Sequence, residues 1–243
     1  MCIIRRCITS PSKGNRVIAR TRGAGPFAAL PQPATRQGPS LAVGPRRTGG
    51  FSPQSRHAMA TFVSMMRGIN VAGSRPLRMD KLRALHEALG FRNVRTYLQS
   101  GNAVFEAAAS GADRHGPALE RRILRDCGYD VAAAVLSAKA MTAVAGANPF
   151  LGRPGIDPRF LHVTFLVRPG ATPSLDGVEL PLARGEAAGV AGDVVYLYCP
   201  LGYGVTRINN TFFERKLSAR ATTRNWQTVT ALERMARGEA PGA

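Results

Sequence analysis

Apolar residues recur in two distinct patterns between residues 62 and 136. Short runs that are apolar, or that alternate between apolar and polar residues, predict strands, because successive side chains of a strand point to opposite faces. Stretches with apolar residues three or four positions apart predict helices. The predicted strands are 62–66, 94–98, 103–105 and 131–136, and the predicted helices are 80–89 and 119–127.

The ends of these elements carry ordinary start and stop signals. Asp80 is expected to cap the first helix, and Gly90 and Gly128 are expected to end the two helices. Ser100-Gly101-Asn102 is typical of a turn, so the two middle strands are predicted to form a tight hairpin.

A similar but less complete pattern follows in the second half of the chain. The segment 139–147 predicts a linking helix that ends at Asn148-Pro149. Beyond it the predicted strands are 161–167 and 193–199, and the predicted helices are 208–217 and 226–236. Residues 170–192 show no convincing helix, so the second unit is expected to repeat the first with one helix missing.

The order strand, helix, strand, strand, helix, strand is that of the ferredoxin-like unit. The predicted fold class is therefore α+β, with two ferredoxin-like (α-β plait) units, each an antiparallel sheet with helices on one face. The predicted first unit is 59–140, the linker is 141–158, and the second unit with its C-terminal helix is 159–243.

Residues 1–58 differ in composition from the rest of the chain. They hold ten of the 33 Lys and Arg residues and no Asp or Glu, so most of the net charge of +18 belongs to them and about +8 remains elsewhere. Pro, Gly and Arg dominate without periodicity, which predicts a disordered leader. The favoured interpretation is a start codon assigned too far upstream of Met59. A transit peptide or a basic arm for nucleic acid or an anionic membrane surface are the alternatives.

Several functional classes have no support in the sequence. No apolar stretch approaches the ~20 residues of a membrane span. Cys127 and Cys199 are predicted to be buried hydrophobic residues of a reducing compartment, so a cytoplasmic location is expected. His86 lacks the second histidine of a zinc helix, and neither a metal nor another cofactor is indicated.

Three polar segments, far apart in the sequence, are candidates for a site. The loop after the first strand has the glycine spacing of a phosphate-binding loop but lacks its lysine, since Ser74 and Arg75 follow Gly73. The Gln99–Asn102 turn and the start of the last helix at 222–226 carry side chains that can bind a ligand. Each also has an ordinary structural role, as a surface loop, a hairpin tip and a helix cap.

Four stretches of the chain resemble motifs of a bacterial family, domain of unknown function 1697, in the expected order. They are 61–73, 96–105, 210–217 and 221–229, and the resemblance extends over about 60–237. The resemblance implies two α-β plait domains, supports Met59 as the start, and implies no activity. Two departures are Val71-Ala72 before Gly73, where a double glycine is usual, and the missing helix at 170–192. The motif residues that carry over are Arg67, Asn70, Gly73, Gln99, Ser100, Asn102, Arg224, Asn225 and Trp226.

Three hypotheses about function follow. The first is a cleft between the two units that binds a small anionic ligand, in which Arg67 and Arg224 hold the anion and Gln99, Asn102 and Asn225 orient it. The second is an RNA-binding module that uses an open sheet face, with Phe62 and Phe105 as stacking residues. The third is a structural or partner-binding protein. No residue stands out as a nucleophile or general base, so no reaction is assigned.

Overall fold

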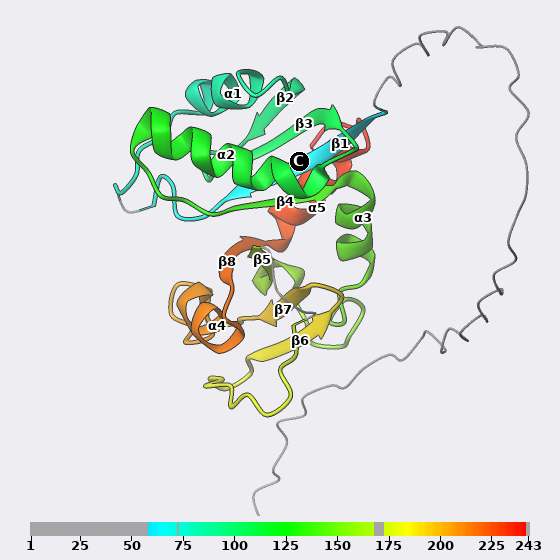
Figure 1. Cartoon of the computed structure of the whole chain (residues 1–243). Coiled ribbons are helices and arrows are strands. Elements are labelled where there is room, and N and C mark those ends of the chain that lie inside the picture. The colour runs from blue at the N-terminus through cyan, green and yellow to red at the C-terminus, as the bar shows by residue number, and fades with distance from the viewer. Residues whose placement is uncertain (1–57, 72, 168–172, 242–243) are drawn as a thin grey trace, which may run out of the picture.

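The protein is an α+β structure with two four-stranded antiparallel sheets in the residues that the computed structural model describes, which are 58–71, 73–167 and 173–241 (Figure 1). The predicted leader lies outside the described residues, apart from Ala58.

The first sheet has the strand order β2-β3-β1-β4. Its strands are β1 (Met59–Met66), β2 (Arg92–Tyr97), β3 (Asn102–Ala108) and β4 (Ala133–Ser137). Helix α1 (Met79–Glu87) follows β1, and helix α2 (Ala112–Cys127) follows β3. The elements predicted for 62–136 are therefore present in the predicted order. The predicted cap is wrong, because α1 begins after Arg78 and Asp80 lies inside its first turn.

The second sheet has the strand order β6-β7-β5-β8. Its strands are β5 (Leu161–Val167), β6 (Ala187–Ala191), β7 (Val194–Tyr198) and β8 (Arg220–Asn225). Helix α4 (Asn210–Leu217) precedes β8, and α5 (Trp226–Ala236) follows it directly. The described residues 173–186 contain no helix, as expected. Strands β6 and β8 were not predicted.

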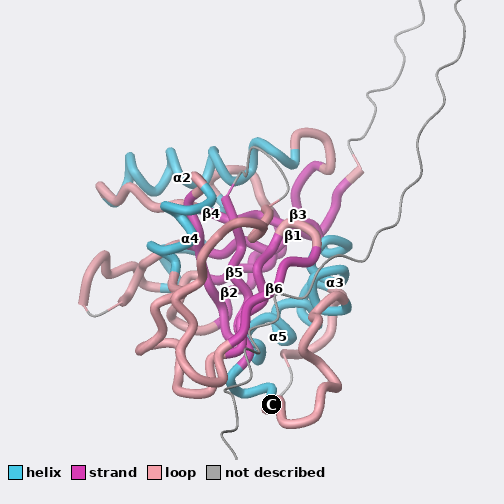
Figure 2. Tube along the Cα trace, turned by 90° about the horizontal axis from the view of Figure 1, so that it is seen from below, coloured by secondary structure: helices cyan, strands magenta, loops and turns pink. Residues whose placement is uncertain are grey.

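The two sheets share one hydrophobic core. Helix α3 (Ala138–Gly146) follows β4, and the short 3-10 helix η1 (Pro158–Phe160) leads into β5. Helices α3 and α5 lie side by side (Figure 2), and both contribute to the core that the two sheets share. Buried residues of both sheets and both helices form this core; examples are Val63, Val104, Met141, Phe165 and Leu232.

The expectation of helices on one face of each sheet holds for α1 and α2 of the first sheet but is wrong for α4 and α5 of the second. Helices α1 and α2 cover one face of the first sheet, where Phe62 and Phe105 are buried, and α3 and α5 cover the other. In the second sheet, Val195 and Leu197 pack toward α4 while Val163 and Phe165 face the shared core. A strand that carries apolar side chains on both of its faces is buried on both sides of the sheet.

The turn between β2 and β3 packs tightly against the loop that follows β1. Gly101 has a φ of +78°, and a Cβ atom there would lie 2.5 Å from Ile69 Cδ1 and 2.9 Å from Met66 Cβ. The absence of a side chain at this position therefore allows the turn to approach the loop.

Replacing Gly101 by alanine is expected to lower the free energy of unfolding by about 1–3 kcal/mol more than replacing Gly90 by alanine, because the added methyl group overlaps the core. Gly90 is a matched control, since its φ is +80° and nothing lies within 4 Å of the added Cβ. Urea unfolding of the two variants gives the comparison. Equal losses would show that the turn has room to adjust.

Candidate functional site

Arg224 joins the three polar segments that the sequence singled out. It lies on β8, its side chain is buried, and it reaches across to the first sheet. Its Nε donates to Asn102 Oδ1 at 2.6 Å, and its Nη2 donates to the carbonyl oxygens of Met66 at 2.8 Å and Ser100 at 3.0 Å. Its Nη1 donates to Thr222 Oγ1 and to the Thr223 carbonyl oxygen. The predicted convergence of the segments is therefore present.

All of these acceptors are neutral. A guanidinium has five N–H donors, and Arg224 makes five hydrogen bonds without a carboxylate among its partners. Burial lowers the pKa of Arg224 to about 10, so the side chain keeps its positive charge at neutral pH. A buried charge without a counter-ion is costly, and an anion bound nearby would offset that cost.

A pocket of about 620 Å³ lies over Arg224, between the two sheets. The first unit contributes the loop after β1 and the β2–β3 turn. The second unit contributes β5, the loop around Tyr203, and the first turns of α4 and α5. No Asp or Glu lines the pocket among the described residues. The polar and charged lining residues are Arg67, Ser100, His162, Tyr203, Asn209, Asn210, Thr211, Thr222, Thr223, Arg224, Asn225 and Thr228.

Two helices begin at this pocket, each capped by an asparagine. Asn209 Oδ1 accepts from the Phe212 amide at the start of α4, and Asn225 Oδ1 accepts from the Thr228 amide at the start of α5. Each cap satisfies only one of the first-turn amides. The positive ends of both helix dipoles therefore add to the charge of Arg224. The predicted capping role of Asn225 is confirmed.

Tyr203 places a hydrogen-bond donor in the same pocket. Its hydroxyl is buried and has no hydrogen-bond partner among the described residues. Burial raises the pKa of Tyr203, and the Thr223 side chain and the Asn210 backbone oppose this shift from positions that do not meet the geometry of a hydrogen bond. The ring stacks on His162 with centroids 4.9 Å apart. An unsatisfied buried donor requires an explanation, and a ligand acceptor supplies one.

His162 presents a neutral ring to the pocket. Burial lowers the pKa of His162, and the carbonyl oxygen of Phe160 accepts from its Nδ1 at 3.2 Å. Its Nε2 is therefore the unprotonated nitrogen. Nearby, Thr164 donates to Thr223, which donates in turn to Asn210 Oδ1 at 2.7 Å. This chain fixes the side-chain amide of Asn210 with its nitrogen as the remaining donor.

Arg67 does not offer its charge to the pocket as the sequence suggested. Its guanidinium binds Glu214 of α4 through two hydrogen bonds of 2.6 and 2.7 Å. The same carboxylate accepts from the Ala221 amide at 2.9 Å. Arg67 is therefore neutralised and ties the first unit to α4, and Arg224 remains the uncompensated cation.

The other predicted site residues have structural contacts. Asn70 binds the backbone of Leu77 and the Gln99 carbonyl oxygen, so it holds the loop against the turn. The Gln99 side chain is exposed and outside the pocket lining, and so is Gly73, which has a φ of +76°. Asn102 lies beneath the pocket, where it orients Arg224. Trp226 packs against the shared core.

Sequence reasoning missed several residues that line the pocket, among them His162, Tyr203, Asn210 and Thr228. Asn210 opens one of the motif stretches, so the resemblance offered a signal for it. In the sequence, His162 is recognisable only as one residue of an alternating strand. Tyr203 lies in a glycine-rich loop without hydrophobic periodicity. Their place in the site depends on the packing of the second unit.

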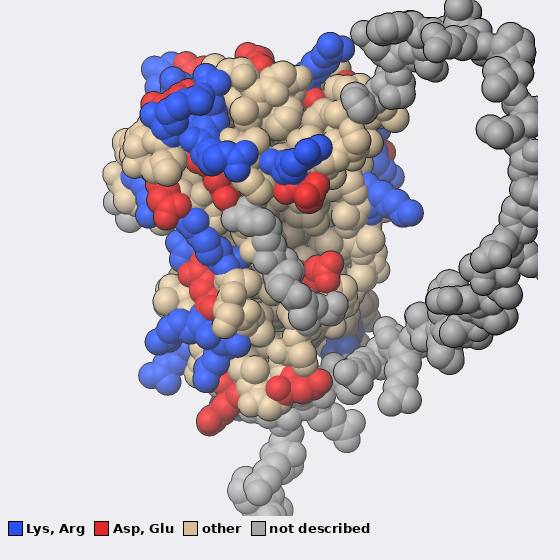
Figure 3. Space-filling view, in the orientation of Figure 1, with Lys and Arg blue, Asp and Glu red and all other residues tan. Residues whose placement is uncertain are grey.

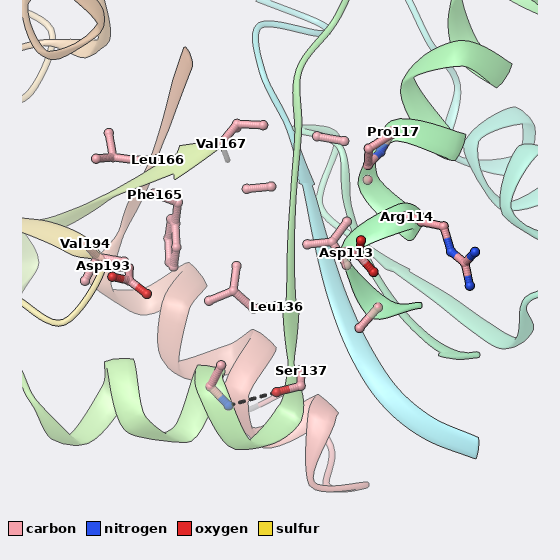
Figure 4. Close-up of a pocket in the computed structure, with 16 residues that line it drawn as sticks. Asp113, Arg114, Pro117, Leu136, Ser137, Phe165, Leu166, Val167, Asp193 and Val194 are labelled. Atoms are coloured by element: carbon pink, nitrogen blue, oxygen red, sulfur yellow. Dashed lines mark hydrogen bonds between the residues drawn. The ribbon is translucent and has the colours of Figure 1, made fainter. Parts of the chain in front are cut away.

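Two other features of the fold lack what a ligand site needs. A groove of about 630 Å³ beside β4 and β5 is mostly apolar, with Leu136 and Phe165 on facing walls (Figure 4). It carries no converging polar groups that would fix a ligand. Ser64 and His86 form a hydrogen bond of 2.9 Å, but both are fully buried, so no substrate reaches them.

Neither metal chemistry nor reactive thiols find support in the described part of the chain. No group of three or more His, Cys, Asp or Glu side chains is placed there to hold a metal ion. Cys199 is buried, and burial raises the pKa of its thiol to about 11, whereas Cys127 is half-buried. Both described cysteines are free.

Basic residues gather over α4 on the face shown in Figure 3. Arg215 and Lys216 are exposed there, whereas Arg220 pairs with Asp130 at 3.0 Å and Arg224 is buried. The basic residues near α4 therefore do not form one continuous exposed surface.

The comparisons with known proteins agree with this architecture. The sequence profile of the family described as "Protein of unknown function (DUF1697)" matches residues 59–196. The chain belongs to this family. The DUF1697 match ends before the motifs at 210–217 and 221–229, so those two rest on the resemblance alone. A search of curated proteins finds no match.

A solved structure shares the fold. It is "the structure of conserved bacterial protein SP0830 from Streptococcus pneumoniae", which aligns with a TM-score of 0.59 and 22% identity over 74% of this chain and 99% of that one. At this identity the likeness concerns the fold alone. The likeness therefore assigns no function to this DUF1697 member.

Proposed function

We propose that the protein binds a small anionic ligand in the pocket between its two sheets. The observation that carries the proposal is the buried guanidinium of Arg224, which has five neutral acceptors and no counter-ion. Tyr203 and the starts of α4 and α5 line the same pocket, and a hydroxyl donor and helix N-termini favour an anion. Of the residues named from sequence, Arg224 and Asn225 act in the pocket, and Asn102, Ser100 and Arg67 hold its walls together. No reaction is assigned.

We also propose a fold type for the two units and a cellular location for the protein. The order β4-β1-β3-β2 with α1 and α2 on one face is that of an α-β plait, and we assign residues 59–140 and 159–243 to two such units on either side of 141–158. None of the helices in the described part combines the length and apolar character of a membrane span. We propose a cytoplasmic, bacterial protein, on the grounds of the free cysteines and the family resemblance.

The RNA-binding hypothesis has less support. Phe62 and Phe105 are 2% and 0% exposed, packed against each other beneath α1 and α2, so neither is placed to stack on a base. The opposite face of the first sheet is covered by α3 and α5. Salt-dependent binding of single-stranded RNA would be needed to revive the hypothesis.

Anion titrations followed by thermal unfolding test the proposal. We expect inorganic phosphate or acetate to raise the melting temperature saturably, compared with chloride at equal ionic strength. Tyr203→Phe is expected to weaken the binding about tenfold, because a hydrogen bond to a charged acceptor contributes about 1.5 kcal/mol or more. Tyr129→Phe is the control, since its hydroxyl binds the Pro76 carbonyl oxygen outside the pocket. An absent response, or the same response in both variants, would refute anion binding here.

A further inference from the structure

The pocket over Arg224 has apolar residues in its lining, here called the apolar wall, as well as polar ones. Val71 and Leu98 line it and are 57% and 55% exposed, whereas Ile69 continues the same wall and is buried. These three residues come from the first unit. Most of the polar groups, among them Tyr203, Arg224 and the starts of α4 and α5, come from the second unit. A ligand that filled the pocket would therefore contact both kinds of surface.

Leu98 is held in an unusual backbone conformation. Its φ is +56°, in the left-handed region that residues with a branched side chain rarely adopt. Tertiary structure keeps such strain most often at ligand sites. The side chain contributes little to the core, because more than half of it is exposed, and it lies at the rim of this pocket. The strain is explained if the exposed side chain contacts a ligand.

The size of the pocket also favours a ligand with an apolar part. A volume of about 620 Å³ lies within the range of roughly 300–1,000 Å³ that is typical of pockets for small organic molecules. A bare inorganic anion would occupy only a small part of that space. The remainder borders Ile69, Val71 and Leu98, which have no hydrogen-bonding side chains.

We infer that the ligand is an organic oxyanion, with a phosphate or carboxylate head at Tyr203 and the Arg224 end of the pocket, and an apolar body against Val71 and Leu98. The inference rests on the proposed anion-binding function and adds the class of ligand. The shared chemistry is an anionic head joined to an apolar body. The two head groups are separated by the choice of probes.

The test compares phenyl phosphate with inorganic phosphate, and benzoate with acetate, by calorimetric titration of the full chain. We expect phenyl phosphate or benzoate to bind about tenfold or more tightly than its small counterpart, because the phenyl group leaves water. The pair that shows the advantage identifies the head group. Equal affinity within both pairs would overturn the inference.

Variants test whether the tighter binding of the phenyl compounds depends on the apolar wall. Leu98→Asn removes the apolar side chain and retains a residue that tolerates the left-handed region. We expect it to reduce the advantage of the phenyl compound over its small counterpart to about threefold or less. Leu201→Asn is the control, because Leu201 is 63% exposed and lies outside the pocket lining.

The results separate the two proposals. If small anions bind, Tyr203→Phe weakens that binding and the phenyl compounds bind no more tightly, the proposed function is supported and the inference is wrong. A phenyl advantage that persists unchanged in Leu98→Asn would also sink it. Absence of all Tyr203-dependent binding would remove both proposals.

Discussion

Replacing Arg224 by methionine is expected to lower the free energy of unfolding by about 3–5 kcal/mol. Methionine fills part of the space but donates no hydrogen bonds. Five acceptors, among them the carbonyl oxygens of Met66 and Ser100, lose their donor. A loss of about 1–3 kcal/mol for each buried acceptor outweighs the several kcal/mol regained when the charge is no longer buried. Urea unfolding measures the change.

Two companion variants make the Arg224 result specific. Arg224→Lys keeps the charge but offers three donors from one point, so an intermediate loss is expected. Arg220→Met, on the same strand, should change stability by less than about 1 kcal/mol, because Arg220 is half exposed and its partner Asp130 is 77% exposed. An Arg224→Met variant as stable as the parent would contradict the view that this side chain holds the three segments together.

Acidification from pH 6.5 to pH 4 is expected to cost about 3 kcal/mol of stability through His86 alone. Burial lowers the pKa of His86 from 6.5 to about 4 in the folded protein, while the unfolded chain takes up a proton near 6.5. Below pH 6.5 the unfolded state therefore binds more protons, and each pH unit in this window costs about 1.4 kcal/mol. The contribution is absent above pH 6.5 and reaches its limit near pH 4.

His86→Gln tests the origin of this pH dependence. Glutamine does not titrate, so the variant should show a flatter profile of unfolding free energy between pH 6.5 and 4. Its intrinsic stability is lower, because Nδ1 donates to the Leu82 carbonyl oxygen and Ser64 bonds to Nε2. His162→Gln is the comparison, since burial also lowers the pKa of that less buried histidine. Parallel profiles for the parent and His86→Gln would show that other groups cause the acid sensitivity.

Local pattern was sufficient to predict most of the first unit. Its strands and helices carry strong periodicity, and glycines such as Gly90 and Gly128 end the helices with positive φ. The elements missed in the second unit lack these signals. Strand β6 reads Ala-Ala-Gly-Val-Ala, whose residues do not favour strands, and its pairing with β7 forms it. Strand β8 is polar along much of its length and pairs with a strand about 60 residues earlier.

The candidate site was predictable as a set of segments but not as a set of roles. Turn and cap preferences marked Gln99–Asn102 and Asn225, and these depend on neighbouring residues only. The partner of Arg67 is Glu214, which is 147 positions away, so nothing in the local sequence distinguished a paired arginine from a free one. The burial of Arg224 likewise depends on the first sheet packing against β8.

The position of α5 between the sheets has a consequence for how the chain is made. Helix α5 is the last element in the described part of the chain, yet Val229 and Leu232 belong to the same core as Val63 and Val104 of the first sheet. A ribosome releases β1 to β4 long before it releases α5. Until α5 emerges, the nascent first sheet therefore has one apolar face that only α3 covers, and exposed apolar surface of this kind favours aggregation.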